Sequence, residues 1–304
     1  MNSEEFPLVT IVTPTYNQAE YLAETIESIL AQTYPNIEYI VINDGSTDHT
    51  EEVLNLYRER VTCITQENMG QSATLNKGWT IAKGKFIGYL SSDDILYPDA
   101  ISCLVDALKE ADLKKLGVFY GSFNIITQSG RIVKKIEPEK YSKSRLQIDL
   151  ICQPGLGAIF AKELFEKVGG WNEALHQVPD FEFWLRLSAV TTFYKVDCLV
   201  GGYRIHESSA SFKVMDKIRA EEISNVIERF WLTDSKVYAT KLDMMRSKST
   251  SYLLVSKNQA QSKRFLLSLF FLLKSIKYDP LKLFKKETWR TLASGVLRRY
   301  KDYS

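Results

Sequence analysis

The first hundred residues alternate short apolar runs with amphipathic stretches, and this alternation restricts the possible folds more than any other feature. β-rich runs occur at 9–13, 38–42, 60–65 and 85–90. Helical patterns lie between them at 17–32, from Asp48 and Glu51 onward, and at 72–82. Strands that alternate with helices predict a parallel sheet with helices on both faces. We therefore expect an α/β fold.

Polar residues gather where each of these four strands ends. The loops are Pro14-Thr15-Tyr16-Asn17, Asn43-Asp44-Gly45-Ser46, Gln66-Glu67-Asn68-Met69-Gly70-Gln71 and Ser91-Ser92-Asp93-Asp94. In open parallel sheets, ligands bind beyond the carboxyl ends of the strands. Four polar loops at one edge therefore predict one binding site. Asn17, with Glu20 three residues later, also fits a capping box that starts the first helix.

The adjacent carboxylates Asp93 and Asp94 follow a hydrophobic strand. Like charges repel, and partial burial increases the cost. One interpretation is a solvated turn in which one Asp caps the next helix. The other is a divalent cation between the pair and an anionic ligand. The neighbouring polar loops favour the second, because Mg²⁺ or Mn²⁺ held by a carboxylate neutralises a pyrophosphate and stabilises a departing diphosphate.

The common nucleotide-binding and hydrolase fingerprints are absent from the sequence. It contains no G-x-x-x-x-G-K-[ST] and no G-x-S-x-G. The run Gly155-Leu156-Gly157 has Phe160 where a dinucleotide-binding loop has its third glycine. Asp44 has two interpretations at this point: it accepts hydrogen bonds from a nucleobase, or it is an ordinary Asp-Gly turn residue.

The alternation of strands and helices ends at about residue 117. The runs 118–127 and 131–136, joined by Ser129-Gly130, predict a hairpin. A short helix is expected to end at Val168, and another helix is expected over 180–189. Strands are expected at 191–197 and 199–205, and the chain beyond Ser211 should be mostly helical.

The composition is that of an ordinary globular protein. The chain has 304 residues, of which 45% are hydrophobic and 25% charged. The cysteines, Cys63, Cys103, Cys152 and Cys198, are widely spaced and indicate reduced thiols without a zinc cluster. The N-terminal residues lack a signal-peptide pattern, and no apolar run reaches the ~20 residues that span a bilayer. We therefore expect a cytoplasmic location.

Charge is unevenly distributed along the chain. Residues 257–304 carry 12 lysines and arginines against 3 acidic residues, net +9, which leaves 27 against 34, net −7, for the rest. This segment contains the apolar run 265–273, bordered by Lys263, Arg264 and Lys274. The pattern predicts attachment to the anionic inner face of the cell membrane. Packing on the catalytic domain or on another subunit is the alternative, and we expect no nucleic-acid partner.

Residues 8–100 resemble the nucleotide-sugar half of the family 2 glycosyltransferases, the inverting class with the GT-A fold. The matching stretches are TPTYNQAEYLAETIESILAQTYPNIEYIVINDGSTD (13–48), QENMGQSATLNKG (66–78) and the carboxylate pair with its following YPDA. The similarity continues through LFEKVGGWNE (164–173), DFEFWLRL (180–187) and YRIHESSAS (203–211). It implies a Rossmann-like, mostly parallel sheet flanked by helices, with a C-terminal helical extension.

The resemblance also implies which residues bind the nucleotide. Pro14 and Tyr16 would line the base pocket. Asp44 would bind the base, and Asp93 would contact the ribose. The other positions implied for nucleotide binding are Thr15, Asn17, Gly45, Ser46, Asn68, Gly70 and Asn76.

The resemblance implies metal ligands and a catalytic base as well. Asp94 would ligate the Mn²⁺ or Mg²⁺ ion that bridges the diphosphate, and His206 would approach the diphosphate or the metal. Asp180 matches the family's catalytic base, although Asp is also a common helix N-cap. Two positions depart from the family: Ser91 replaces an additional acid, and Pro179 replaces a Glu before Asp180.

The same resemblance implies the domain organisation. We expect a catalytic domain over 1–212, with a nucleotide-sugar half at 1–100 and an acceptor half at 101–212. A helical, basic region over 213–304 would follow.

The expected activity is metal-dependent, inverting transfer of a sugar from a nucleotide-sugar donor, UDP-linked, to a glycan or lipid-linked acceptor in cell-surface polysaccharide synthesis. One alternative is a sugar nucleotidyltransferase, whose glycine- and basic-rich phosphate loop is missing here. Another is a nucleotide-sugar-binding protein that has lost catalysis, against which the survival of all four candidate aspartates argues.

Overall fold

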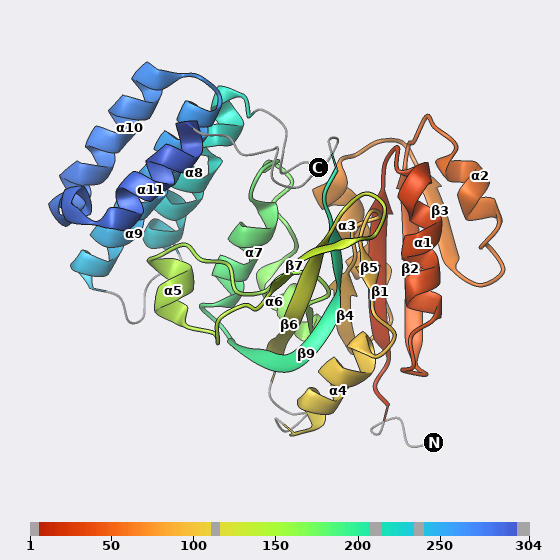
Figure 1. The fold of residues 1–304 in the computed structure, drawn as a ribbon. Coiled ribbons are helices and arrows are strands. Elements are labelled where there is room, and N and C mark those ends of the chain that lie inside the picture. Colours follow the sequence, from red (N-terminus) through yellow and green to blue (C-terminus); the bar gives the residue numbers. More distant parts are fainter. Residues whose placement is uncertain (1–5, 111–115, 207–214, 234–239, 297–304) are drawn as a thin grey trace. The chain divides into compact units, whose positions relative to one another are not determined.

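The computed structural model describes residues 6–110, 116–206, 215–233 and 240–296 (Figure 1). Within these residues a single nine-stranded sheet forms. Its strands are β1 (Val9–Thr15), β2 (Ile37–Asp44), β3 (Thr62–Gln66), β4 (Phe86–Tyr89), β5 (Ile95–Leu96), β6 (Gly117–Ile126), β7 (Ile132–Ile136), β8 (Ile159–Ala161) and β9 (Thr192–Arg204).

The sheet is mixed, with four parallel and four antiparallel strand pairs, and its parallel part is the one that the alternation of strands and helices predicts. The strand order is β3-β2-β1-β4-β8-β6-β9-β5, with β7 paired to β6. The first four strands in this order are parallel to one another, and β6 is parallel to β9. The antiparallel pairs are those made by β5, β7 and β8. The predicted hairpin is the β6–β7 pair.

β1 lies between β2 and β4, in the middle of the parallel strands, and is buried along its whole length. All seven of its residues are buried, as expected for a strand with both faces covered. The flanking helices of this part of the chain are α1 (Ala19–Leu30), α2 (Thr50–Asn55), α3 (Gln71–Ile81), α4 (Ala100–Glu110) and α6 (Lys162–Val168). In α1, Leu22, Ile26 and Ile29 form the buried stripe that helical periodicity predicts.

The start of α1 differs from the sequence-based prediction. The helix begins at Ala19, and its N-cap is Gln18, which makes no side-chain capping bond. Asn17 lies outside the helix with φ of 53°, a left-handed conformation that Asn tolerates. Its side-chain Oδ1 accepts a hydrogen bond from the backbone N–H of Thr47 at 2.7 Å. The predicted capping box is wrong because this side chain joins the first polar loop to the second.

The two strands predicted at 191–197 and 199–205 form one strand, β9. The pairing of β9 with β6 shifts register on both sides of Ser122. Such bulges absorb extra residues without ending a strand. At the bulge a Cβ on Gly121 would lie 2.6 Å from the carbonyl oxygen of Cys198, so the close approach of the two strands requires glycine there.

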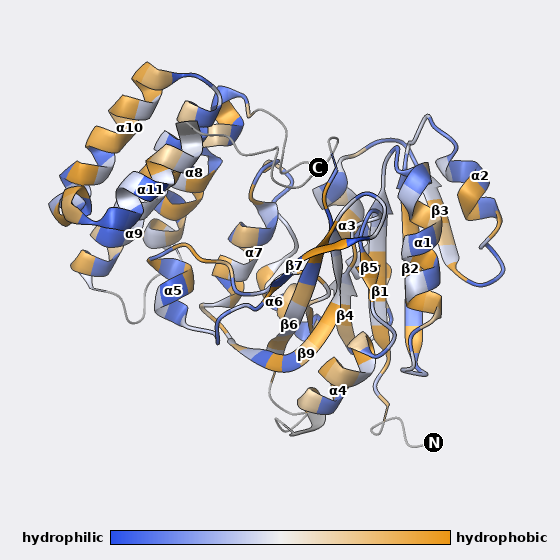
Figure 2. Ribbon diagram, in the orientation of Figure 1, coloured by the Kyte–Doolittle hydropathy of each residue, from blue (hydrophilic) through white to orange (hydrophobic). Residues whose placement is uncertain are grey.

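The helical C-terminal region that the sequence predicts is present. The helices outside the sheet region are α5 (Lys143–Gln147), α7 (Pro179–Leu187), α8 (Lys217–Thr233), α9 (Lys241–Gln261), α10 (Phe265–Tyr278), η2 (Pro280–Phe284) and α11 (Lys286–Val296). Helices α9 and α10 pack through buried serines: Ser249 donates to the carbonyl of Ser275, and Ser256 to that of Ser268. Much of α10 is hydrophobic (Figure 2).

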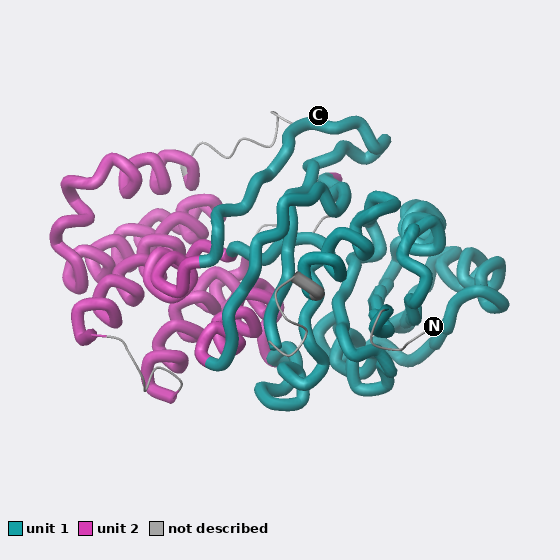
Figure 3. The backbone as a smooth tube through the Cα atoms, turned by 90° about the horizontal axis from the view of Figure 1, so that it is seen from below, with its two compact units in different colours: residues 1–141, 153–173, 190–205 teal, residues 142–152, 174–189, 206–304 magenta. Residues whose placement is uncertain are grey.

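The chain divides into two compact units (Figure 3). Unit 1 comprises residues 1–141, 153–173 and 190–205, and it contains the whole sheet. Unit 2 comprises residues 142–152, 174–189 and 206–304. The chain therefore leaves unit 1 and returns to it twice before it enters the C-terminal helices.

Candidate active site

The carboxyl ends of β1, β2 and β3 lie next to one another in unit 1. The parallel register pairs Thr15 with Asn43, and Asp44 with Gln66. The loops beyond these strands are also joined, because the backbone N–H of Asn17 donates to Oγ of Ser46 at 2.9 Å. The structure thus brings the polar loops of these strands together at one edge of the sheet.

Asp44 is buried and organises the loop that follows β3. Its Oδ1 accepts hydrogen bonds from Gln66 Nε2 and the backbone N–H of Met69, both at 2.8 Å. Its Oδ2 accepts one from the N–H of Gly70 at 2.9 Å. An ionised carboxylate offers about four acceptor positions, so capacity remains for one more donor. Asp44 therefore does more than form a turn, and it can still accept an N–H from a ligand.

Gly45 and Gly70 border this arrangement, and both have positive φ. A Cβ on Gly45 would lie 2.8 Å from the backbone nitrogen of Asn68. The second and third polar loops therefore approach each other closely only because residue 45 has no side chain.

The loop after β1 presents one exposed ring and one buried hydroxyl. Tyr16 is exposed, whereas Pro14 and Thr15 are buried. Within the described part of the chain, Oγ1 of Thr15 is buried without a hydrogen-bond partner. A buried hydroxyl without a partner costs free energy, and at the end of a strand it is available to a ligand.

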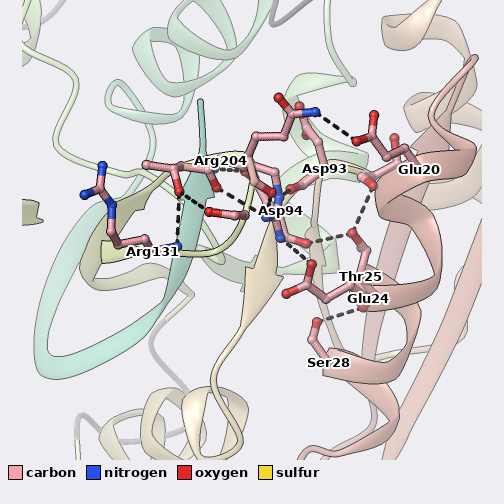
Figure 4. A network of polar contacts seen from close by, with 12 residues as sticks. Glu20, Glu24, Thr25, Ser28, Asp93, Asp94, Arg131 and Arg204 are labelled. Atoms are coloured by element: carbon pink, nitrogen blue, oxygen red, sulfur yellow. Dashed lines mark hydrogen bonds and ion pairs between the residues drawn. The ribbon is translucent and has the colours of Figure 1, made fainter. Parts of the chain in front are cut away.

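The loop that contains Asp93 and Asp94 is held against α1 (Figure 4). The hydroxyl of Thr25 lies 2.9 Å from the carbonyl oxygen of Ser92 and 2.8 Å from that of Asp94. Asp94 is buried and Asp93 is half-buried. Burial, reinforced by the charge of Asp93, raises the pKa of Asp94 well above its usual range, although Arg204 opposes the shift.

Arg204, at the end of β9, contacts this loop and was not among the predicted site residues. Its backbone N–H donates to Oδ1 of Asp94 at 2.7 Å, and its Nε donates to the carbonyl of Asp93 at 2.8 Å. Its Nη2 pairs with Glu24 of α1 at 2.6 Å. The only signal in the sequence is an arginine directly after a strand-like run, within the matching stretch YRIHESSAS.

Asp94 has the chemistry that a divalent cation requires. Its Oδ1 accepts from Arg204, and no described residue donates to its Oδ2. Burial and the charge of Asp93 raise the pKa of this carboxyl, and a cation there would offset both by stabilising its ionised form. No cluster of three or more His, Cys, Asp or Glu side chains occurs among the described residues. That fits Mg²⁺-type sites, which use one or two carboxylates and complete the shell with substrate phosphates and water.

Asn76 makes contacts within the scaffold of unit 1. Its Nδ2 donates to the carbonyl of Trp171 at 2.8 Å and to Glu173 at 3.0 Å. Its Oδ1 accepts the N–H of Trp171 at 2.8 Å. A Cβ on Gly170 would lie 2.0 Å from the same oxygen, which explains the glycine before Trp171. These contacts assign Asn76 a structural role, and its part in nucleotide binding stays a prediction.

Asp180 lies in the first turn of α7, in unit 2. The N-cap of this helix is Val178, so Asp180 is not the cap itself. Burial raises the pKa of Asp180, and hydrogen bonds from the backbone N–H groups of Phe181 and of Asp180 itself lower it by a smaller amount. A carboxylate with a raised pKa is a stronger base than an ordinary one.

The segment that leads into α7 is held by the buried carboxylate of Glu222, on α8. Glu222 accepts the backbone N–H groups of His176 at 3.0 Å and of Gln177 at 2.6 Å. These bonds fix the start of the helix that carries Asp180, and no motif in the sequence indicated them. His206, the other predicted residue of unit 2, is buried.

The sequence is similar to a known family and to individual proteins of known sequence. Residues 10–169 match the family described as "Glycosyl transferase family 2". An uncharacterized glycosyltransferase of Rickettsia prowazekii is 34% identical over 222 residues, which cover 71% of this chain and 70% of that protein. Chondroitin synthase of Escherichia coli is 30% identical over 213 residues, 69% of this chain and 31% of the synthase.

Solved structures share the fold at low sequence identity. S. aureus TarS in complex with UDP-GlcNAc matches with a TM-score of 0.61 and 15% identity, covering 98% of this chain and 82% of that one. A mannosyltransferase from Pyrobaculum calidifontis in complex with GDP-Man and Mn²⁺ has a TM-score of 0.54 and 18% identity, with the same coverage of 98% and 82%. These likenesses confirm the fold predicted from the sequence.

Proposed function

We propose that this chain, which belongs to glycosyltransferase family 2 and has the GT-A fold, is an inverting, metal-dependent enzyme. The family membership makes it a glycosyltransferase. Its donor is a nucleotide sugar, UDP-linked, and its acceptor is a glycan or a lipid-linked saccharide in cell-surface polysaccharide synthesis. The observation that supports this most is the buried carboxylate Asp94, which has one oxygen held by Arg204 and the other without a donor among the described residues.

The donor nucleotide binds at the edge of the sheet beyond β1 and β2. The base N–H donates to the remaining acceptor position of Asp44, and Tyr16 covers the base. Asp93 accepts hydrogen bonds from the ribose. Because both uracil and guanine carry a ring N–H, the preference for UDP is a separate part of the proposal, supported by the likeness to TarS with UDP-GlcNAc.

Asp94 and His206 would hold the divalent ion, Mn²⁺ or Mg²⁺. When bound, the ion would neutralise the donor diphosphate and make it a better leaving group. The mannosyltransferase complex with Mn²⁺ supports use of such an ion. The ion would also offset the repulsion between the adjacent carboxylates of Asp93 and Asp94.

Asp180 acts as the general base. It accepts the proton of the acceptor hydroxyl while that oxygen bonds to the anomeric carbon of the donor sugar. The bond from this carbon to the diphosphate oxygen breaks in the same step, and a nucleoside diphosphate leaves. One displacement of this kind inverts the configuration at the anomeric carbon. The raised pKa of Asp180 supports the role, because base strength increases with pKa.

Residues 257–304 attach the enzyme to the anionic inner face of the membrane. No helix of the described residues has both the length and the hydrophobicity to cross a membrane. Part of α10 is buried, Phe271 among it, but many other apolar side chains of α10 and η2 are exposed, including Leu266 at 87% and Phe284 at 85%. An exposed apolar face with basic neighbours is typical of a helix that lies in the membrane interface. A lipid-linked acceptor would lie at the same surface.

The experiment that tests the proposed activity measures release of nucleoside diphosphate from UDP-sugars and GDP-sugars in Mn²⁺, with and without an acceptor fraction. A donor screen by thermal shift identifies the nucleotide first, because a bound donor stabilises the folded state. Release that depends on acceptor supports transfer. Binding without release indicates the non-catalytic alternative, and pyrophosphate-dependent formation of a nucleoside triphosphate indicates a nucleotidyltransferase.

A further inference from the structure

Arg204 is a buried cation that joins three separate parts of unit 1. Its side chain is 1% exposed. Besides the carbonyl of Asp93, it donates to the carbonyl of Gln128 at 2.7 Å and to that of Thr127 at 3.3 Å, in the turn of the β6–β7 hairpin. The third part of unit 1 that it contacts is α1, through the ion pair with Glu24. Figure 4 shows this arrangement around the Asp93–Asp94 loop.

We propose that Arg204 is a positioning residue for the divalent cation: its guanidinium fixes the backbone of the Asp93–Asp94 loop so that the Asp94 carboxylate is already oriented before the ion binds. This inference rests on the proposed metal role of Asp94. It adds a residue, absent from the predicted site, that acts on the ion through Asp94.

The geometry of the guanidinium matches this task. Arginine presents five N–H donors in a rigid planar fork, whereas lysine offers one rotatable ammonium group. The fork of Arg204 reaches carbonyls of two different loops and one carboxylate at once. The plane also lies over the ring of Tyr21, at 5.3 Å from its centroid. A lysine in this position keeps the charge but cannot make all of these contacts.

The cost of burying this charge argues for a role beyond packing. A buried ion pair is weak evidence for stability, because removing two charges from water is expensive. The partner of Arg204 offsets only part of that cost, since the side chain of Glu24 is 54% exposed. Apolar residues of similar volume stabilise a core at least as well. What they cannot do is bind the carbonyl of Asp93.

The loop is held from both sides. On one side the hydroxyl of Thr25 lies within hydrogen-bond distance of the carbonyls of Ser92 and Asp94. On the other side Arg204 binds the carbonyl of Asp93 through its side chain and Oδ1 of Asp94 through its backbone. Asp94 Oδ2 is left for the ion. Partners that orient a metal ligand typically contribute 10–100-fold to metal affinity.

The test compares Arg204→Lys, Glu24→Gln and the control Arg131→Lys in the full chain. Arg131 lies on the same hairpin, but its side chain is exposed. Mn²⁺ is titrated calorimetrically into each protein in the presence of saturating UDP and, separately, of saturating GDP, well below the melting temperature. We expect Arg204→Lys to weaken Mn²⁺ binding by about 10–100-fold, Glu24→Gln to weaken it by a smaller factor, and the control to bind as the wild type does.

A second measurement separates positioning from general damage. Turnover of Arg204→Lys should need a higher Mn²⁺ concentration and should recover most of the wild-type kcat at saturating Mn²⁺. If Arg204→Lys melts at a lower temperature but binds Mn²⁺ as tightly as the wild type, Arg204 is only structural and the inference is overturned. If Arg204→Lys does not fold, unchanged Mn²⁺ binding by Glu24→Gln overturns it. A wild-type protein that binds no Mn²⁺ with either UDP or GDP contradicts the proposed metal role as well.

Discussion

The backbone N–H of Arg204 donates a hydrogen bond to Oδ1 of Asp94 at 2.7 Å, although 110 positions separate the two residues. This bond attaches the end of β9 to the loop that follows β4. A change of the Arg204 side chain to any residue other than proline keeps the donor of this bond, because the donor is the backbone N–H. The contributions of the Asp94 carboxylate and of the Arg204 guanidinium can therefore be tested by separate substitutions.

Asp94→Asn should remove most of the metal-dependent turnover. The amide oxygen can still accept the N–H of Arg204, so the loop keeps its position, but a neutral amide is a poor ligand for a hard cation. Turnover of donor with acceptor is measured at increasing Mn²⁺. Asp106→Asn, an exposed carboxylate on α4, is the matched control and should keep full activity. Full activity of Asp94→Asn in excess chelator would contradict the metal assignment.

The same variant should be at least as stable as the wild type when no metal is bound. Burial and Asp93 raise the pKa of Asp94 in the folded protein. The folded state therefore keeps a proton that the unfolded chain loses near pH 4, so the stability of the metal-free wild type falls as the pH rises from about 4 to the raised pKa. Asn has no such titration. Urea unfolding without metal at pH 4–8 measures the difference, and a lower stability of Asp94→Asn at pH 7 contradicts the argument.

The strands and the polar loops at one edge of the sheet could be predicted from the sequence. The contacts of Arg204 that hold the Asp93–Asp94 loop could not. Buried parallel strands such as β1 are uncharged and rich in β-branched residues, so their ends and the polar loops beyond them are visible in the sequence. The contacts of the Arg204 side chain span 76 to 180 positions. No local periodicity encodes such distances. The contact of Glu222 with the start of α7 was missed for the same reason, at a separation of 45 positions from Gln177.

Local conflicts explain the two errors in secondary structure. Asn is a residue type that commonly caps helices, but the side chain of Asn17 accepts the N–H of Thr47 and does not cap α1. The break predicted between residues 197 and 199 does not occur. The parallel pairing with β6 instead keeps the strand continuous through its bulges.

Asp180→Asn should bind nucleotide and Mn²⁺ normally but transfer sugar about 100-fold more slowly or worse, the usual scale for loss of a general base. Because burial raises the pKa of Asp180, the rate of the wild type should fall as pH drops through a value above the ordinary Asp pKa of about 4. The rate of the variant should not show this fall at low pH. Asp149→Asn, an exposed carboxylate of unit 2, controls for charge. Near-normal transfer by Asp180→Asn would leave Asp180 a purely structural residue of α7.

The last prediction concerns the exposed face of α10. Leu266 and Leu269 are exposed, so replacing both with Gln should not unfold the protein. This double variant is a better test than a truncation at Ser256, which would cut α9 and remove the helix that packs on it. Each exposed leucine that enters a membrane gains about 1.5–3 kcal/mol, so the double variant should bind vesicles at least about a hundredfold more weakly. Sedimentation with vesicles of increasing anionic lipid content measures this.

Wild-type binding to these vesicles should rise with the anionic fraction and fall with salt, because lysines and arginines near the surface each contribute about 1 kcal/mol that salt screens. The matched control is Leu56→Gln, since Leu56 is 79% exposed but belongs to unit 1. It should bind as the wild type does. If the wild type and the α10 variant both stay in the supernatant at every lipid composition, the apolar face of α10 covers a protein surface instead. A concentration-dependent change in oligomeric state that only the α10 variant lacks would then identify a second copy of this chain as its partner.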